Sequence, residues 1–180
     1  MSRVLVRAGL PALVALAACD LSAPVWSADF VFPVDFPDVE LADYAIFGQI
    51  PDGDLPFFTA PEQQDISGLL EEFLSDDLTG LTAEVITETN VAVTATMTIS
   101  IAADPADLFA PGRSITTTLT TTQGVDTTMV VADADILRDA IALYYRIQGT
   151  LRGGPGGTPV GAGDRIAVRV NLLTTYRVEP

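Results

Sequence analysis

The chain has 180 residues, 48% of them hydrophobic, and 24 acidic residues against 9 basic ones give a formal net charge of -15. This length and apolar content suit one folded domain with a core and exclude a disordered chain, while the acidity argues against nucleic acid as a partner. The sequence has no histidine and only one cysteine, which excludes disulfide scaffolds, most metal sites and catalysis by histidine.

The chain begins with a segment typical of a processing signal. Arg3 and Arg7 form a basic start, and the apolar stretch over 8–18 is shorter than the roughly 20 residues that span a bilayer. The stretch ends in Leu16-Ala17-Ala18-Cys19, a branched apolar residue and two small residues before a cysteine. This resembles the lipobox of bacterial lipoproteins, in which the cysteine thiol takes the lipid.

The resemblance implies a signal peptide over 1–18 and a lipidated Cys19 that begins a short tether over 19–29. It places the protein in the bacterial cell envelope as a membrane-anchored lipoprotein, on the periplasmic face of the inner membrane or in the outer membrane. Several acyl chains on one residue make a stable anchor. The alternative is an ordinary secretory signal in which Cys19 is incidental.

The first folded element is expected at 30–37, where three phenylalanines and a valine alternate onto one face. Pro33 and Pro37 have the same parity, so their missing N–H groups fall on one side of the strand. Proline is tolerated where that side has no neighbour. The segment therefore predicts an edge strand that covers an apolar core.

A helix is predicted next, from Thr59 or Pro61 to Leu74, because an acidic first turn precedes apolar residues at helical spacing. The strongest β pattern follows at 84–101, where apolar residues and threonines share one face. A single strand of that length is unusual, so Asn90 is expected to mark a bend or bulge.

The second half of the chain continues the alternation. Further strands are expected at 114–122, 125–131, 142–151 and 165–178. Gln123-Gly124 predicts a tight turn, and Asp133 is expected to cap a short helix that gives way to a strand near Ala142. The threonine rows at 116–118 and 120–122 fit a solvated strand face.

One-sided alternation favours antiparallel pairing with a solvated outer face. The sequence therefore predicts an all-β fold, an antiparallel β-sandwich of two sheets and about six to eight strands, with one or two short helices. We expect a single domain over 30–180.

Charge is distributed unevenly along the chain. Residues 20–112 contain 18 acids and no base, whereas 113–180 contain seven arginines and six acids. Arg165, Arg169 and Arg177 share one face of the last predicted strand. Either they pair with acids on neighbouring strands of the same molecule, or they form a docking face for an acidic partner.

Catalytic and metal-binding patterns are weak. A serine hydrolase triad and a serine–lysine dyad are both impossible without histidine and lysine, and no pair of acids stands out for glycoside hydrolysis. Asp52, Asp54, Asp133 and Asp135 are candidate calcium ligands, but none belongs to a full calcium loop. Asp-Gly is more typical of a turn and Asp133 of a helix cap. We expect no cofactor.

Phe57 and Phe58 lie in a predicted loop at 51–61, and in extended chain one of the two rings faces outward. An exposed ring there marks a binding site for a protein or a glycan. The leading hypothesis is a non-enzymatic envelope lipoprotein that binds or scaffolds a partner. The alternatives are a carboxylate-dependent glycan hydrolase and a calcium-stabilised adhesion module; oligomeric state is left open.

Overall fold

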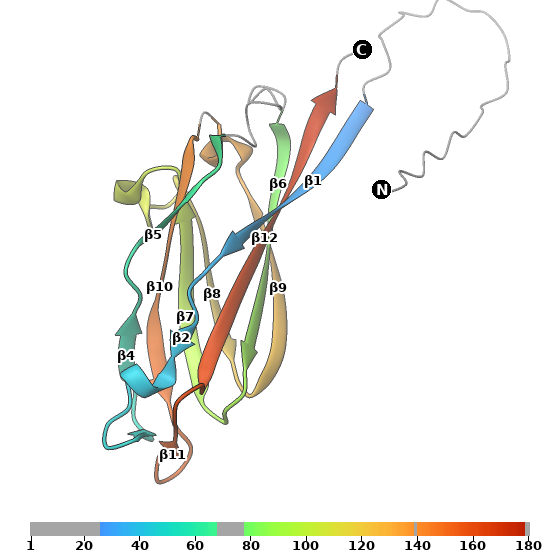
Figure 1. Cartoon of the computed structure of the whole chain (residues 1–180). Helices are drawn as coiled ribbons and strands as arrows, with labels where there is room; N and C mark the ends of the chain where they lie inside the picture. The colour runs from blue at the N-terminus through green and yellow to red at the C-terminus, as the bar shows by residue number, and fades with distance from the viewer. Residues whose placement is uncertain (1–25, 68–77, 139, 179–180) are drawn as a thin grey trace, which may run out of the picture.

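The structure is a computed structural model that describes residues 26–67, 78–138 and 140–178, with the backbone alone described at 26–29, 177 and 178. Two antiparallel sheets stack on each other (Figure 1). The first contains β1 (Trp26–Asp35), β12 (Arg165–Val178), β6 (Leu78–Thr89) and β9 (Gly124–Ala132) in that order, with β2 (Val39–Glu40) also paired to β12. The second contains β4 (Leu55–Phe58), β10 (Ala142–Arg152), β7 (Thr94–Ala102) and β8 (Ser114–Thr121), with β5 (Glu62–Asp65) also paired to β10. A small ladder joins β3 (Gln49–Ile50) to β11 (Thr158–Pro159).

If β4 and β5 are taken as two parts of one interrupted strand, eight principal strands are divided equally between the two sheets. Numbered along the chain, their order is first-eighth-third-sixth in one sheet and second-seventh-fourth-fifth in the other. This is the strand order of a jelly roll. The predicted all-β antiparallel sandwich is therefore confirmed, and seven strands within the described residues are eight or more residues long.

The long alternating segment at 84–101 divides into two strands at Asn90, as expected. β6 and β7 lie in different sheets but keep one parity across the bend, so Val85 and Ile99 both face the space between the sheets at 2% exposure. The Asn90 amide donates to the carbonyl of Gly163 and accepts from the backbone N–H of Arg165. These bonds attach the bend to the start of β12.

The proline-bearing strand β1 lies at the edge of its sheet, which confirms that prediction, but it begins at Trp26, inside the segment 19–29 that was predicted as a tether. Its inward residues line the core: Phe30 meets Tyr176 edge-on, with ring centroids 5.5 Å apart. Phe36, just beyond the strand, packs on Tyr145 at 4.5 Å. Pro33 is exposed, and its carbonyl accepts from the side-chain amide of Gln64 in β5 at 3.1 Å.

The predicted helix at 59–74 is wrong at its start. Residues 62–65 are β5, an edge strand whose Glu62 lies opposite Tyr145 of β10. The proline and the acidic residue that suggested a helix N-terminus are also compatible with an edge strand. Residues 68–74 of that prediction lie outside the described residues, as do the predicted signal peptide at 1–18 and Cys19.

The other predicted turns have simple outcomes. Asp133 caps a helix as expected, its carboxylate accepting from the N–H of Asp135, but the helix is a single 3-10 turn, η4 (Ala134–Ile136). β10 starts at Ala142, where the boundary was predicted. The turn at Gln123 carries the chain from one sheet to the other, so β9 pairs with β6. None of the helices in the described part is long and apolar enough to cross a membrane.

Candidate functional site

The strand β4 places its two phenylalanines on opposite sides of the second sheet. Phe57 is 3% exposed and belongs to the core, whereas Phe58 is 64% exposed on the outer face, so the expectation that one ring faces outward is confirmed. Tyr44 holds both: its ring meets that of Phe57 edge-on at 5.6 Å, and its hydroxyl donates to the carbonyl oxygen of Phe58 at 2.9 Å. Burial, followed by the charge of Asp43, raises the pKa of Tyr44 above its ordinary value of 10.0.

Arg146 lies beside the exposed ring. Its guanidinium carbon is 5.4 Å from the centroid of Phe58, and its Nε donates to the carbonyl oxygen of Thr59 at 3.1 Å. The Thr59 hydroxyl accepts from the N–H of Ile147 at 3.1 Å, while the Thr59 N–H donates to the Ile147 carbonyl at 2.9 Å. These bonds attach the end of β4 to β10, so ring and cation are held in a fixed relation.

A ladder of hydroxyl pairs continues this surface across β7 and β8. The pairs are Thr96 with Thr120 at 3.2 Å, Thr98 with Thr118 at 2.9 Å, and Ser100 with Thr116 at 3.2 Å. Gln148 of β10 lies opposite Phe58 on one side and opposite Thr98 on the other. One row across the sheet therefore runs from an aromatic ring through an amide to two hydroxyls.

We call this surface the Phe58 face. It comprises the outward side chains of Phe58, Arg146, Gln148, Thr96, Thr98, Thr118 and Thr120. At its rim Arg152 pairs with Asp54 at 2.8 Å, so charge there is largely balanced. The face combines an apolar ring with hydroxyl and amide groups that both donate and accept hydrogen bonds.

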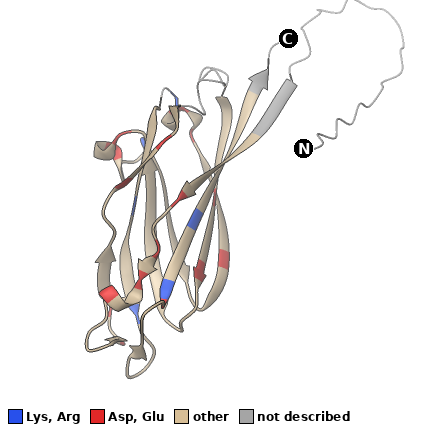
Figure 2. Ribbon diagram, viewed as in Figure 1, with Lys and Arg blue, Asp and Glu red and all other residues tan. Residues whose placement is uncertain are grey.

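The arginines predicted to share one face of β12 in the first sheet, Arg165, Arg169 and Arg177, are only partly ion-paired within the molecule. Arg165 forms an ion pair with Asp38 at 3.1 Å, as the intramolecular interpretation expects. Arg169 is exposed on β12 between Asp35 and Ile86 of the flanking strands, and within the described residues no carboxylate lies within 4.0 Å of it. Figure 2 shows these cations on β12 among scattered acids. The side chain of Arg177 lies outside the described residues.

Three of the four candidate calcium ligands have other roles. Asp54 is paired with Arg152, Asp135 with Arg138 at 2.7 Å, and Asp133 caps η4. Asp52 lies in the same turn as Asp54. Within the described ranges no group of three or more His, Cys, Asp or Glu side chains is placed to hold a metal ion.

The carboxyl groups bear on the alternative of a glycan hydrolase. A glycoside hydrolase needs a carboxyl group whose pKa is raised. At Asp65 the pKa shift goes the other way, because the backbone N–H and then the hydroxyl of Ser67 donate to it and lower its pKa.

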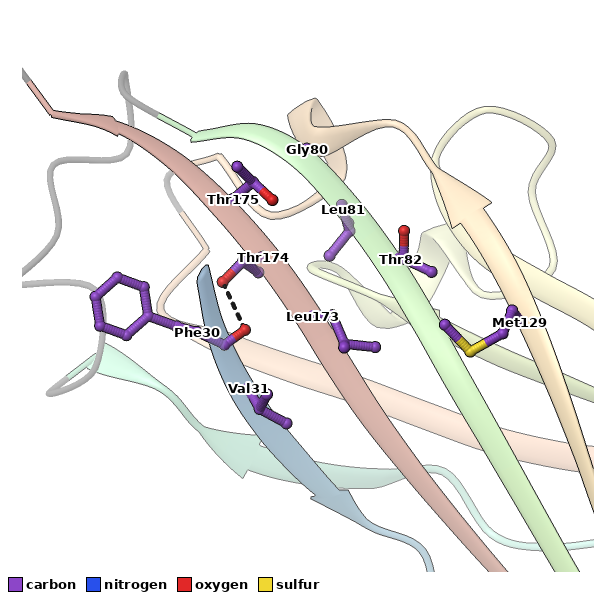
Figure 3. A pocket seen from close by; sticks show the side chains of 9 residues that line it. All are labelled: Phe30, Val31, Gly80, Leu81, Thr82, Met129, Leu173, Thr174 and Thr175. Atoms are coloured by element: carbon purple, nitrogen blue, oxygen red, sulfur yellow. Dashed lines mark hydrogen bonds between the residues drawn. The ribbon is translucent and has the colours of Figure 1, made fainter. Parts of the chain in front are cut away.

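The outer face of the first sheet carries a shallow groove of about 310 Å³ (Figure 3). No charged side chain lines it, and Val31, Leu173 and Met129 supply much of its apolar wall. Thr174 donates to the carbonyl of Phe30 at 3.4 Å along its side. The groove extends toward the exposed strand β9, to which Met129 belongs.

No protein-family model matches the chain, and no curated protein matches it. Solved structures with some likeness include Desmodium yellow mottle tymovirus, at 10% identity and a TM-score of 0.35, covering 100% of this chain and 97% of that chain. Another is a semi-empty VLP of the giant freshwater prawn Macrobrachium rosenbergii nodavirus, at 16% identity and a TM-score of 0.39, covering 100% of this chain and 95% of that chain. A third is Mud crab tombus-like virus, at 10% identity and a TM-score of 0.39, covering 88% of this chain and 94% of that chain. Likeness at this level carries no argument about function.

Sequence reasoning found Phe58 but missed Arg146 and Gln148. Both lie in a strand that was predicted correctly, but their place beside the ring depends on the pairing of β10 with β4, residues nearly 90 positions apart. The threonine rows were the one sequence signal for the ladder. Their partners on β7 became evident only from the register.

Proposed function

We propose that the protein is a lipid-anchored lipoprotein of the bacterial cell envelope that binds a neutral glycan on the Phe58 face and catalyses no reaction. The observation that carries the proposal is the row of Phe58, Gln148 and Thr98 across three neighbouring strands on the outer face of the second sheet. A sugar ring presents an apolar face for an aromatic side chain and hydroxyl groups at its edge for amides and hydroxyls.

Electrostatics favours an uncharged ligand on this face. The mature chain is strongly acidic, which repels polyanions. The face itself has one cation, Arg146, which is already engaged with the Phe58 ring and the Thr59 carbonyl, and the Arg152–Asp54 pair at the rim is balanced. Recognition therefore rests on stacking and neutral hydrogen bonds.

The anchor rests on the lipobox resemblance. Six residues lie between Cys19 and Trp26, the first residue of β1, and the seven Cα–Cα steps from one to the other span at most about 25 Å when fully extended. A lipid on Cys19 would thus keep the sandwich close to the membrane and its ligand within the envelope. Intact mass of the membrane-fraction protein tests this: a species that begins at residue 19 and carries acyl mass is expected, and Cys19→Ala abolishes it. Unlipidated wild-type protein rejects the anchor.

Glycan binding is tested separately on an array of neutral bacterial polysaccharides, followed by titration of those retained. Phe58→Ala is expected to weaken affinity by about 10-fold, equivalent to about 1.4 kcal/mol, because the stacking surface is lost. Phe47→Ala is the matched control, since Phe47 is fully exposed but lies outside the Phe58 face. No retained glycan, or equal losses in the two variants, rejects the proposal.

A further inference from the structure

The strand β9 forms one edge of the first sheet and is unusually exposed. None of its nine residues is buried, and its outward side chains Val131, Val125 and Met129 are 85%, 65% and 55% exposed. An edge strand also has a row of backbone N–H and C=O groups without a neighbour strand. β9 therefore combines open hydrogen-bonding capacity with exposed apolar surface.

Two of the other three edges of the described sandwich carry protections that β9 lacks. The β1 edge of the first sheet carries Pro33. In the second sheet, the edge beside β10 is divided into the short strands β4 and β5, and β4 contains Pro56. The β8 edge has neither proline nor charge, but its exposed side chains are threonines and not large apolar residues. β9 has no proline or basic residue, and its single acid, Asp126, accepts from the Thr121 hydroxyl at 2.9 Å. The usual protections against edge pairing are missing here.

We propose that β9 is a self-association edge, on which a second copy of this chain pairs antiparallel through its own β9, with a twofold axis at Thr128. The axis at Thr128 is the midpoint of Gly124–Ala132, so the two strands overlap over their full length. With the axis normal to the sheet, the outer faces of both copies lie on the same side.

This register is the one that the side chains support. It sets Val125 opposite Val131 of the partner copy and Thr127 opposite Met129 of the partner copy, so the exposed apolar side chains cover each other. Asp126 then faces Val130. Moving the axis to Thr127 leaves Val131 opposite Gln123, beyond the strand, and moving it to Met129 sets Val125 opposite Asp133.

Charge also selects against a larger shift. An axis at Asp126 would place the two Asp126 carboxylates directly opposite each other, which is destabilising across a strand pair. In the Thr128 register no acid of β9 opposes another acid. The first sheets of the two copies then form one continuous sheet. The apolar groove of each copy, which reaches Met129 (Figure 3), would lie next to the other copy.

Paired thiols test the register directly. Thr127→Cys and Met129→Cys are made separately in the full chain carrying Cys19→Ala, so that each variant has a single thiol. Side chains directly opposite have Cβ atoms about 4.5–5.5 Å apart, near the range that a disulfide bridges, whereas diagonal neighbours at about 7–8 Å are too far apart. The mixture of the two variants should form an oxidised dimer, and each variant alone should form little.

Sedimentation of the unmodified full chain in detergent supplies the second measurement. A monomer–dimer equilibrium is expected, and Val131→Lys should shift it by at least 10-fold toward monomer. Val31→Lys is the matched control, because Val31 is 57% exposed on the same sheet but lies on the proline-protected edge β1. A monomer at all concentrations, equal effects of the two lysines, or cross-linking of either cysteine variant alone as fast as the mixture overturns the proposal.

Discussion

Thr87 offers a sharp test of how the core is organised. Its side chain faces the space between the sheets at 1% exposure, and its Oγ1 has no hydrogen-bond partner among the described residues. Thr89, two residues along the same strand and the same face, is 3% exposed, but its hydroxyl donates to the Val91 carbonyl at 3.4 Å. The two positions differ in whether a buried hydroxyl is satisfied.

The expected magnitude follows from that difference. A buried polar group without a partner costs about 1–3 kcal/mol, and valine replaces the hydroxyl by a methyl group of similar shape. Thr87→Val should therefore raise the free energy of unfolding by about 1–2 kcal/mol. For a domain of this size that corresponds to a rise in melting temperature of roughly 2–8 °C. Thr89→Val removes a hydrogen bond and should be neutral or destabilising by up to about 1 kcal/mol.

Equilibrium unfolding in urea, followed by far-UV circular dichroism, measures both variants against the wild type. The slope of the unfolding free energy against urea must stay constant for the comparison to hold. If Thr87→Val is less stable than the wild type, or gains no more than Thr89→Val, the Thr87 hydroxyl has a partner and the reasoning fails.

Two further predictions concern stability. Gly149→Ala should destabilise the protein by about 1–3 kcal/mol in the same urea assay, because a Cβ there would collide with the Thr96 carbonyl oxygen. Gly53→Ala is the control, since a Cβ at Gly53 has open space and should change stability little. Equal effects of the two alanines would contradict the packing argument. Burial raises the pKa of Tyr44, Tyr145 and Tyr176 above the ordinary value of 10.0. The folded state therefore holds these protons more tightly than the unfolded state. The stability that this difference contributes is complete below about pH 10 and is lost as pH rises through the raised pKa values. Unfolding free energy measured from about pH 8 to about pH 11.5, with tyrosinate absorbance recorded alongside, should hold below about pH 10 and fall above it; a flat profile would contradict the shifts.

Much of the sandwich could be predicted because its signals are local. Parity along 84–101 survives the change of sheet at Asn90, since both strands face one shared core, and the prolines of β1 mark an edge in any topology. The helix prediction failed where the signal was nonlocal. Residues 62–65 are Glu-Gln-Gln-Asp, with no apolar side chain to indicate a face, and they form a strand because β10 lies beside them.

Some features of the candidate site also have local sequence signals and others do not. The exposed ring of Phe58 follows from adjacent phenylalanines in extended chain, and the Asp133 cap from its position before a short turn. The neighbour Arg146 and the hydroxyl partners on β7 depend on register between strands far apart in sequence, which a single sequence does not encode locally. The same holds for the pairing of Arg165 with Asp38.

The position of β12 has a consequence for the timing of folding. This last strand lies between β1 and β6, so the first sheet cannot be assembled until residues 165–178 have left the ribosome. Contacts between chain segments so far apart in sequence are entropically costly to form, and folds dominated by them are slow, completing in milliseconds to seconds. The first sheet of this chain can therefore close only after its last strand has been synthesised.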